Sequence, residues 1–464
     1  MSSIDAILER LALNEGQALD RLFDILRIPS ISTMPEHARS CEKAAAWFFN
    51  AFSEMGFSAR IVATPGHPAV VAQYRNPDPD RPHIVYYGHY DVQPTDPIAA
   101  WTTDPFEPAI ADSEHGPQIV ARGAADDKGQ VVAWMEAFRA HLAVDGCLPV
   151  HVTAIVEGEE ETGSPHFEHV LYALGGDFHG DAAIISDGTM WDRSTASITT
   201  QLRGLVYLEV TVATASMDLH SGLFGGAVPN AAHCLCMLLA NLIGTDGRIA
   251  VPGFYDDVKL PPAHILSAWK DLEFDEVRFL EAVGLTQVTG EHGYSLLERL
   301  WSRPTAEVNG IWGGFTGLGT KTVVPKNATA KVSFRLVPGQ DPQKVVAGFR
   351  QFADEYLGPD CRAEIDVIEA APAVELPSNN RWSCDAIAAL GDEFGKPPLQ
   401  IGCGGSLEAV NAIQHVLGIP TVLFSFGLDD DRVHGPNEKF DLACFRLAAR
   451  SHARLLSRWT YREK

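Results

Sequence analysis

The sequence contains no long apolar run: within its 464 residues, no segment approaches the roughly 18 consecutive apolar residues that a membrane-spanning helix needs. Its first residues, MSSIDAILERLALNEGQ, form an amphipathic pattern with acidic positions, where a secretion signal would have a basic start and an apolar block. The 8 cysteines show no CxxC spacing, which favours reduced thiols. We therefore expect a cytoplasmic protein that has no membrane partner.

Basic side chains are scarce, with 36 lysines and arginines against 60 aspartates and glutamates and a formal charge of -24. Such a chain repels a phosphate backbone and offers no basic stripe to follow one, which argues against nucleic acid as a partner. Disorder is not indicated either, since hydrophobic residues make up 46% and charged residues 21% of the chain. The length predicts two packed domains, or three at most.

Three well-known catalytic signatures are also missing. The chain has neither the GxSxG of a serine hydrolase nor the HExxH of a single-zinc protease. Its glycine-rich segment GCGGS lacks the lysine of a phosphate-binding loop. The chemistry of this protein therefore has to come from other residue clusters.

What the sequence does contain is an alternation of helical and strand-like segments, which predicts an α/β fold with a mostly parallel sheet flanked by helices. Helical patterns cover 18–26, 37–55 and 129–142, and apolar runs cover 69–73, 83–87, 150–156 and 182–185. The alternation returns after Pro372, with helices at 384–394, 407–416 and 441–459 and a strand at 420–426. We expect one catalytic domain made from residues 1–203 and 373–464.

The middle of the chain, residues 204–372, has a different pattern. Its elements follow the order strand, helix, strand, strand, helix, strand, which is the split order of ferredoxin-like α+β domains. They cover 205–214, 230–243, 321–324, 329–337, 342–356 and 361–368, with a mostly helical insertion between 256 and 301. We expect this segment to be an inserted domain.

Polar residues gather where three of the four early apolar runs end. GHYD follows the run at 83–87, EGEEETGS follows the run at 150–156, and SDG follows the run at 182–185. His89 and Asp91 are two positions apart, so in a strand they would lie on the same side. Parallel sheets form their sites beyond the carboxyl ends of the strands, so these residues are expected near one another.

Five clusters in all carry side chains that can bind metals. They are His89 with Asp91, Asp126 with Asp127, Glu159 to Glu161, Asp187, and His434. Each has another interpretation by itself: a loop histidine bonded to a carboxylate, a helix cap, a solvated turn, a turn pair or an ordinary loop. Histidine nitrogen with carboxylate oxygen suits zinc, or alternatively manganese or cobalt. Together the clusters suffice for two ions that share a bridging carboxylate.

Six segments give the chain a resemblance to a known family. In order and approximate spacing, GHYDVQP, ARGAADDKG, EGEEETGS, SDG, DLHSG and HGPNE resemble the signature segments of two-metal metallopeptidases over nearly the whole chain. This family contains carnosinase-type and cytosolic nonspecific dipeptidases, glutamate carboxypeptidase and succinyl-diaminopimelate desuccinylase. The segments DLHSGLFGG, KTVVPK and SFRLVP are most similar to the dipeptidase branch.

The resemblance implies two metal sites that share one carboxylate. Asp126 would bridge both ions. His89 and Asp187 would complete one site, and Glu161 and His434 the other. Two ions about 3.5–4 Å apart can hold a water between them, lower its pKa and polarise the scissile carbonyl. Aspartate at position 187, where some carboxypeptidase members have glutamate, is more similar to the aminopeptidase and dipeptidase members.

The resemblance also assigns the proton chemistry. Glu160 would be the general base that takes the proton of the bridging water and passes it to the leaving amine. Asp91 would orient His89, as carboxylates commonly do for a histidine that binds a metal. Because the side chains of Glu160 and Glu161 diverge, one can bind metal while the other moves protons.

The inserted domain would act as a lid and dimerisation domain. His220 in DLHSG would reach the active site of the partner subunit and stabilise the oxyanion, so the resemblance implies a homodimer. Arg335 would bind the free carboxylate of the substrate with its planar, two-pronged donor. Further substrate contacts are expected at Thr322, Asn230 and Ser406.

These features together predict a cytoplasmic enzyme that uses two divalent ions, zinc in first place, to hydrolyse dipeptides with a free C-terminal carboxylate. An N-acyl-amino-acid amidohydrolase or carboxypeptidase of the same family is the alternative. A metal-binding protein of this fold without hydrolytic activity is the rival from another class. The presence of Glu160 beside the full set of expected ligands argues against that rival.

Overall fold

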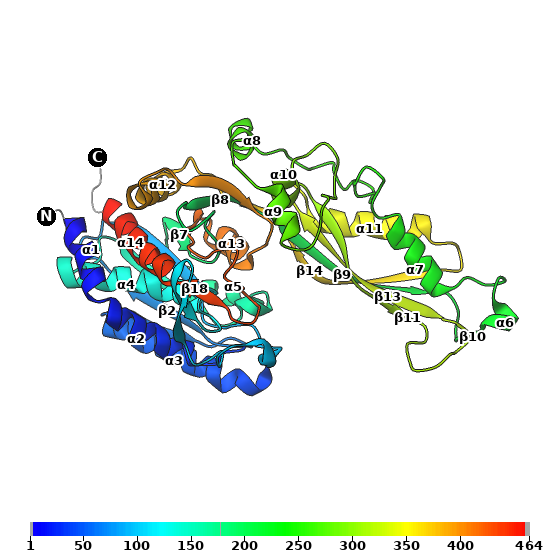
Figure 1. Ribbon diagram of the computed structural model, residues 1–464, viewed down its shortest axis with the longest axis horizontal. Helices are drawn as coiled ribbons and strands as arrows, with labels where there is room; N and C mark the ends of the chain where they lie inside the picture. Colours follow the sequence, from blue (N-terminus) through cyan, green and yellow to red (C-terminus); the bar gives the residue numbers. More distant parts are fainter. Residues whose placement is uncertain (1–2, 177, 460–464) are drawn as a thin grey trace. The chain divides into compact units, whose positions relative to one another are not determined.

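The computed structural model describes residues 3–176 and 178–459, and its chain divides into two compact units (Figure 1). Unit 1 comprises residues 1–199, 376–400 and 407–464, and unit 2 comprises residues 200–375 and 401–406. The short segment 401–406, which the sequence pattern assigns to the catalytic domain, is thus grouped with unit 2. The role of unit 2 as a lid and dimerisation domain stays a prediction.

The centre of unit 1 is a six-stranded sheet in which four neighbouring strands are parallel. In spatial order the strands are β1 (Ser58–Val62), β2 (Ala69–Tyr74), β6 (His151–Glu157), β3 (His83–His89), β7 (Ala182–Ile185) and β17 (Thr421–Leu423). Only β1 and β2, at one edge, run antiparallel to their neighbours. Every residue of β3 and β6 is buried, as expected for central strands covered on both faces. The predicted α/β class is confirmed.

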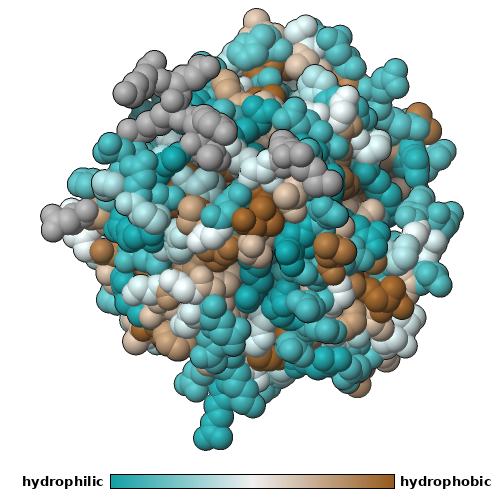
Figure 2. Space-filling model, turned by 90° about the vertical axis from the view of Figure 1, so that its left-hand side faces the viewer, coloured by the Kyte–Doolittle hydropathy of each residue, from teal (hydrophilic) through white to brown (hydrophobic). Residues whose placement is uncertain are grey.

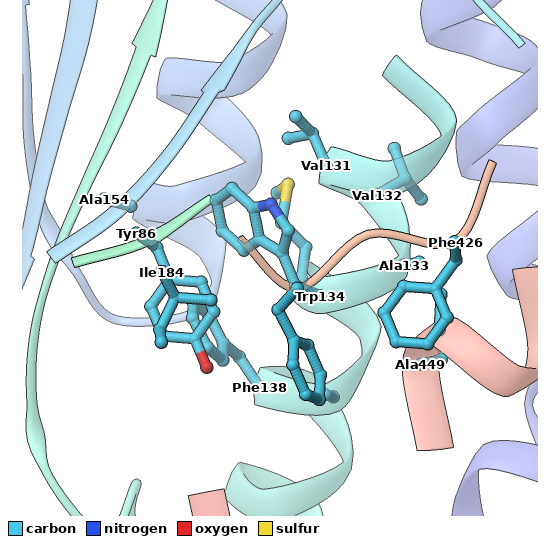
Figure 3. Packing of buried hydrophobic residues seen from close by; sticks show 14 of the residues in the cluster. Tyr86, Val131, Val132, Ala133, Trp134, Phe138, Ala154, Ile184, Phe426 and Ala449 are labelled. Atoms are coloured by element: carbon cyan, nitrogen blue, oxygen red, sulfur yellow. The ribbon is translucent and has the colours of Figure 1, made fainter. Parts of the chain in front are cut away.

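Helix α4 (Lys128–Asp145) packs on β3 and so holds the segment that precedes the helix near the end of that strand. Trp134 and Phe138 of this helix pack on Tyr86 of β3, with ring centroids 5.3 and 4.9 Å from that of the tyrosine (Figure 3). Gly88 allows the close approach, because a Cβ atom there would lie 2.3 Å from Cγ2 of Val131. Large buried rings with such contacts stabilise the packing, so the first residues of α4 are held beside the carboxyl end of the sheet.

Further helices contribute apolar side chains to the same core, and Figure 1 shows α4 and α14 side by side. These helices are α1 (Ser3–Leu13), α2 (Glu15–Leu26), α3 (Ala38–Glu54), α12 (Arg381–Phe394) and α14 (Leu442–Arg458). Shorter elements of unit 1 are α5 (Phe167–Tyr172), α13 (Glu408–Ala412) and the helical turns η1 (Pro35–His37), η2 (Ile98–Ala100), η3 (Glu160–Thr162) and η4 (Ile413–Leu417). The helix expected at 407–416 is thus divided into α13 and the π-helical turn η4.

Two smaller three-stranded sheets are also present. One has the order β18 (Lys439–Asp441), β5 (Gly116–Val120), β4 (Ala109–Ser113), and the other has the order β15 (Val374–Glu375), β8 (Ser197–Leu202), β16 (Leu399–Cys403). The pairing of β18 with β5 is antiparallel and brings the segment after His434 next to the segment before Asp126. Two distant parts of the sequence therefore meet at this small sheet.

Unit 2 contains a four-stranded antiparallel sheet with two helices on one face, which is the ferredoxin-like arrangement. The strands, in spatial order, are β11 (Thr305–Gly313), β13 (Asn327–Leu336), β9 (Gly204–Ala213) and β14 (Arg362–Ala371). Helices α7 (Ala231–Ala240) and α11 (Pro342–Tyr356) share a core with alternate residues of β9 and β13, for example Leu208 and Phe334. The other face of the sheet carries the intervening residues.

One strand of this sheet was predicted at the wrong place. Residues 321–324 were expected to pair within it, but β12 (Val323–Val324) pairs with β10 (Leu219–His220) in a separate two-stranded ribbon. The missing strand is β11, which the sequence pattern conceals for two reasons. Ala306 is its only buried residue, and a bulge between Val308 and Gly310 interrupts the register. The remaining helices of unit 2 are α6 (Ser221–Phe224), α8 (Ala263–Lys270), α9 (Glu276–Glu281) and α10 (Leu296–Trp301).

The surface agrees with the acidic composition. Figure 2 shows a face on which hydrophilic side chains predominate and hydrophobic ones are scattered. Across residues 3–176 and 178–459, no helix combines the length and apolar character that crossing a membrane requires.

Candidate metal centre

The predicted ligands lie beyond the carboxyl ends of parallel strands. His89 is the last residue of β3, Glu161 follows β6 in the turn η3, and Asp187 follows β7. His434 is on the loop that follows β17, and Asp126 lies two residues before the buried start of α4, next to the N-cap residue Asp127. Parallel strands bring their carboxyl ends to the same edge of a sheet, so these distant segments converge.

The five side chains form two groups that share Asp126. One group contains His89, Asp126 and Asp187, and the other contains Asp126, Glu161 and His434. Within each group the possible ligand atoms all lie within 4.8 Å of one another. The structure thus brings together the residues that the sequence singled out, while their assignment as metal ligands stays a prediction.

The shared aspartate contacts one histidine with each of its oxygens. Asp126 Oδ1 is 3.1 Å from His89 Nε2, and Asp126 Oδ2 is 3.0 Å from His434 Nε2. The two remaining carboxylates complete the groups, because Asp187 Oδ2 lies 3.8 Å from His89 Nε2 and Glu161 Oε2 lies 3.3 Å from His434 Nε2. This is the geometry that a bridging carboxylate requires.

Asp91 holds more of the site than the sequence indicates. Its carboxylate lies 3.4 Å from His89 Nδ1, and its backbone oxygen is closer, at 3.0 Å. The two carboxylate oxygens also accept hydrogen bonds from the backbone N–H groups of Glu160 (3.2 Å) and Glu161 (3.1 Å). One buried aspartate therefore fixes both the imidazole of His89 and the turn that carries the two glutamates.

Glu160 lies beside the first group, with Oε2 4.0 Å from His89 Nε2. Burial raises the pKa of Glu160 well above its usual value, and repulsion from Asp187 and Asp126 adds to this effect while His89 opposes it. A carboxyl group with a raised pKa accepts a proton more readily than an ordinary carboxylate does.

The charges of the two groups fit a cation. Burial raises the pKa of Asp187 to about 7, and repulsion from Asp126 and Glu161 contributes to the rise although His89 opposes it. Hydrogen bonds with Asp126 and Glu161 raise the pKa of His434 to about 10. The negative carboxylates thus repel one another and favour a positive charge between them, at the positions where a divalent ion would lie. Imidazole nitrogen with carboxylate oxygen is a donor set that zinc accepts.

The sequence did not reveal some residues that hold these ligands. The carboxylate of Glu438, which is fully buried, accepts hydrogen bonds from Arg122 Nη1 (2.8 Å) and from the backbone N–H groups of Gly123 (3.0 Å), Ala125 (2.9 Å) and Asp126 (3.1 Å). Gln93 Nε2 donates to Glu161 Oε2 at 2.8 Å. Glu438 was visible only as part of HGPNE, and Gln93 only as part of GHYDVQP.

A buried lysine anchors the loop that carries His434. Lys439 Nζ pairs with Asp430 at 2.8 Å, with Asp441 at 3.0 Å and with Asp431. The loop is strained, since Arg432, His434 and Asn437 have φ values of 57, 63 and 60°. Left-handed residues other than glycine persist where the surroundings fix them, and they gather at functional sites.

The predicted residues of unit 2 are described within that unit alone. His220 Nδ1 accepts a hydrogen bond from the N–H of Gly222 at 3.0 Å. Asn230 Oδ1 caps α7 by accepting from Ala232 N at 2.9 Å, which gives this side chain a structural role. Arg335 Nη1 donates to Ser406 Oγ at 3.3 Å. The side chain of Thr322 is exposed.

A family model described as peptidase family M20/M25/M40 matches residues 85–458, a stretch that contains both ligand groups. The chain belongs to peptidase family M20/M25/M40. The family predicted from the six segments is thereby confirmed.

M20 relatives named as dipeptidases match most of the chain. The Cys-Gly metallodipeptidase dug1 of Schizosaccharomyces pombe is 28% identical over 460 residues, which cover 96% of this chain and 95% of that protein. The Beta-Ala-His dipeptidase of Rattus norvegicus is 30% identical over 384 residues, covering 81% and 77%. Among solved structures, that of the dipeptidase Dug1p from Saccharomyces cerevisiae has a TM-score of 0.85 and 26% identity, with 100% of both chains covered.

Proposed function

We propose that this M20 protein is a metal-dependent dipeptidase, which hydrolyses the peptide bond of dipeptides that have a free C-terminal carboxylate. The observation that carries the proposal is the pair of ligand groups that meet at Asp126 with Glu160 beside them. The similarity to Cys-Gly and Beta-Ala-His dipeptidases supports the same class of reaction.

The donor set supports two divalent ions, with zinc as the first choice. His89, Asp126 and Asp187 would hold one, and Asp126, Glu161 and His434 the other. When bound, the ions supply Lewis acidity, which lowers the pKa of water and polarises a carbonyl group.

Glu160 performs the proton transfers. It removes a proton from the attacking water and delivers it to the amine that leaves, for which its raised pKa suits it. Asp91 keeps Glu160 in place by accepting its backbone N–H, and keeps His89 oriented by contacting Nδ1. Loss of Asp91 would therefore disturb the proton transfer and one ligand group together.

Unit 2 supplies the contacts that recognise the substrate. Because His220 Nδ1 accepts from Gly222 N, the proton of a neutral His220 is on Nε2, which can donate to an oxyanion. We assign this role to His220 within a cytoplasmic homodimer. Arg335 binds the free carboxylate. Ser406 accepts a hydrogen bond from Arg335 and so lies beside the same carboxylate.

The test is hydrolysis of a panel of dipeptides, N-acyl amino acids and C-terminally amidated dipeptides. Chelated protein is assayed before and after zinc, manganese or cobalt is added back. The proposal predicts that metal restores cleavage of free-carboxylate dipeptides and not of their amides. Preferential cleavage of N-acyl amino acids would favour the amidohydrolase alternative. Protein that binds two ions and cleaves nothing would overturn the proposal.

A further inference from the structure

A second arginine lies close to Arg335 in unit 2. Arg203 directly precedes β9, and residues two apart on a strand share a face. Arg335 on β13 pairs in register with Leu205 of β9. The neighbouring residues Val206 and Phe334 point to the opposite face, into the apolar core. Leu205 and Arg335 therefore belong to the face that α7 and α11 do not cover. Arg203 enters the sheet at the same end.

Arg203 is held firmly by the glycine-rich segment 402–406. Its backbone N–H donates to Gly405 O at 3.0 Å, and its Nε donates to Gly404 O at 2.9 Å. The segment packs tightly on this side chain, because a Cβ atom at position 404 would lie 2.9 Å from Arg203 Nη2 and 3.1 Å from the backbone oxygen of Leu300. The guanidinium is thus fixed in one orientation.

The outer edge of this guanidinium has no partner. Nη1 of Arg203 is buried and has no hydrogen-bond partner among the residues that the structure describes. A buried donor without an acceptor costs about 1–3 kcal/mol, and more for a charged group. A hydrogen-bond acceptor supplied by a ligand would remove this cost.

Arg335 also lacks a carboxylate partner within the part of the chain that the structure describes. Ser406 Oγ, at 3.3 Å, is a neutral partner, and no carboxylate of residues 3–176 or 178–459 lies within ion-pair distance of either guanidinium. Glu307 attracts Arg203 and Glu369 attracts Arg335, but both act only across longer distances. Two positive groups therefore share this end of the sheet without a neutralising anion.

Burial lowers the pKa of Arg203 to about 10, and the charge of Arg335 contributes to the lowered pKa. Arginine is otherwise protonated throughout the accessible pH range. A carboxylate placed between the two groups would remove this penalty.

We propose that Arg203 is a second substrate-binding arginine, which together with Arg335 and Ser406 forms a pocket for the C-terminal carboxylate of the substrate. The inference rests on the proposed function for the identity of the ligand. Its negative charge is inferred from the two guanidinium groups, neither of which has an ion-pair partner among the described residues. Planar, forked donors suit a carboxylate because they bind both of its oxygens. Two such forks with a hydroxyl select a free carboxylate over an amide.

The first test uses Arg203→Met, which keeps the apolar stem and removes the charge, with Arg203→Lys as the variant that keeps the charge without the fork. Arg350→Met, which removes an exposed arginine bonded to Ile365 O, is the matched control. KM and kcat are measured separately for a dipeptide that has a free C-terminal carboxylate.

The pocket predicts that Arg203→Met raises KM for the free acid about 10–100-fold, the range expected when a hydrogen-bonded charge is lost. The kcat for the bound dipeptide should change little. Arg203→Lys should recover part of the loss, and the effects of Arg203→Met and Arg335→Met should be less than additive, since both contact one anion. A fall in kcat with an unchanged KM would assign Arg203 to the support of segment 402–406 and overturn the inference.

A binding measurement separates this inference from the proposed function. N-acetylglycine, with N-acetylglycine amide as control, is titrated calorimetrically into the wild-type, Arg203→Met and Arg203→Lys proteins. If the protein cleaves no dipeptide but the wild type binds the acid more tightly than Arg203→Met does, the reaction is refuted and the pocket is supported. Equal binding by both proteins, or none by the wild type, would refute the pocket.

Discussion

Replacement of Glu438 by alanine tests how the two ligand groups are held together. The wild-type carboxylate satisfies three backbone N–H groups and the guanidinium of Arg122, all within 3.1 Å. Arg122 is 1% exposed and Glu438 is fully buried, so water cannot replace the lost acceptor. Removal of one partner from a buried charge pair costs about 3–5 kcal/mol. The backbone of Asp126 loses its fixed position at the same time.

The assay is urea unfolding of chelated protein followed by equilibrium dialysis against zinc. Glu438→Ala should lower the free energy of unfolding by about 3–5 kcal/mol, and should lower the affinity of both ligand groups because Asp126 belongs to each. Glu107→Ala is the control, since Glu107 forms only an exposed pair with Arg27, and such pairs contribute about 0–1 kcal/mol. A Glu438→Ala protein within 1 kcal/mol of the wild type that still bound zinc normally would refute the reasoning.

Two other predictions concern the site and the core. Glu160→Gln should keep metal binding and lower kcat by about 100-fold or more, whereas His434→Ala should lose one of two metals. Both variants are measured by metal analysis and steady-state kinetics. Full activity in either variant contradicts the assignment. Burial lowers the pKa of His452 from 6.5 to about 3, so the folded protein keeps this side chain neutral where the unfolded chain protonates it. Stability is therefore lost as pH falls from about 6.5 towards 3. His452→Phe should flatten the pH dependence of the free energy of unfolding in that window, and an unchanged slope in urea titrations would show that other groups dominate.

The position of the site could be predicted because ligands and strands obey local rules. His89, Glu161 and Asp187 directly follow apolar runs, and such runs mark buried parallel strands without reference to the rest of the chain. The ferredoxin-like order could also be predicted, although β11 could not, because its exposed edge and its bulge leave no alternation in the sequence.

The supporting residues could not be predicted because their partners are backbone atoms of remote segments. Glu438 bonds to N–H groups that every residue has, so no side chain in the partner segment reveals the contact. Arg203 is similar, since its partners are the carbonyl oxygens of two glycines. A sequence pattern shows where apolar side chains recur and where side chains of opposite charge could pair. A bond from a side chain to a backbone atom produces neither signal.

The inserted position of unit 2 has a consequence for how the enzyme is made. Ala125 and Glu438 are hydrogen-bonded although they are 313 positions apart in the chain. During synthesis five of the six strands of unit 1's central sheet can form early, but β17, His434 and Glu438 leave the ribosome only after all of unit 2. A nascent chain can therefore assemble the group of His89, Asp126 and Asp187 and not the group that needs His434. Hydrolytic competence therefore arises only when the segment that carries His434 and Glu438 packs against the segment that carries Asp126.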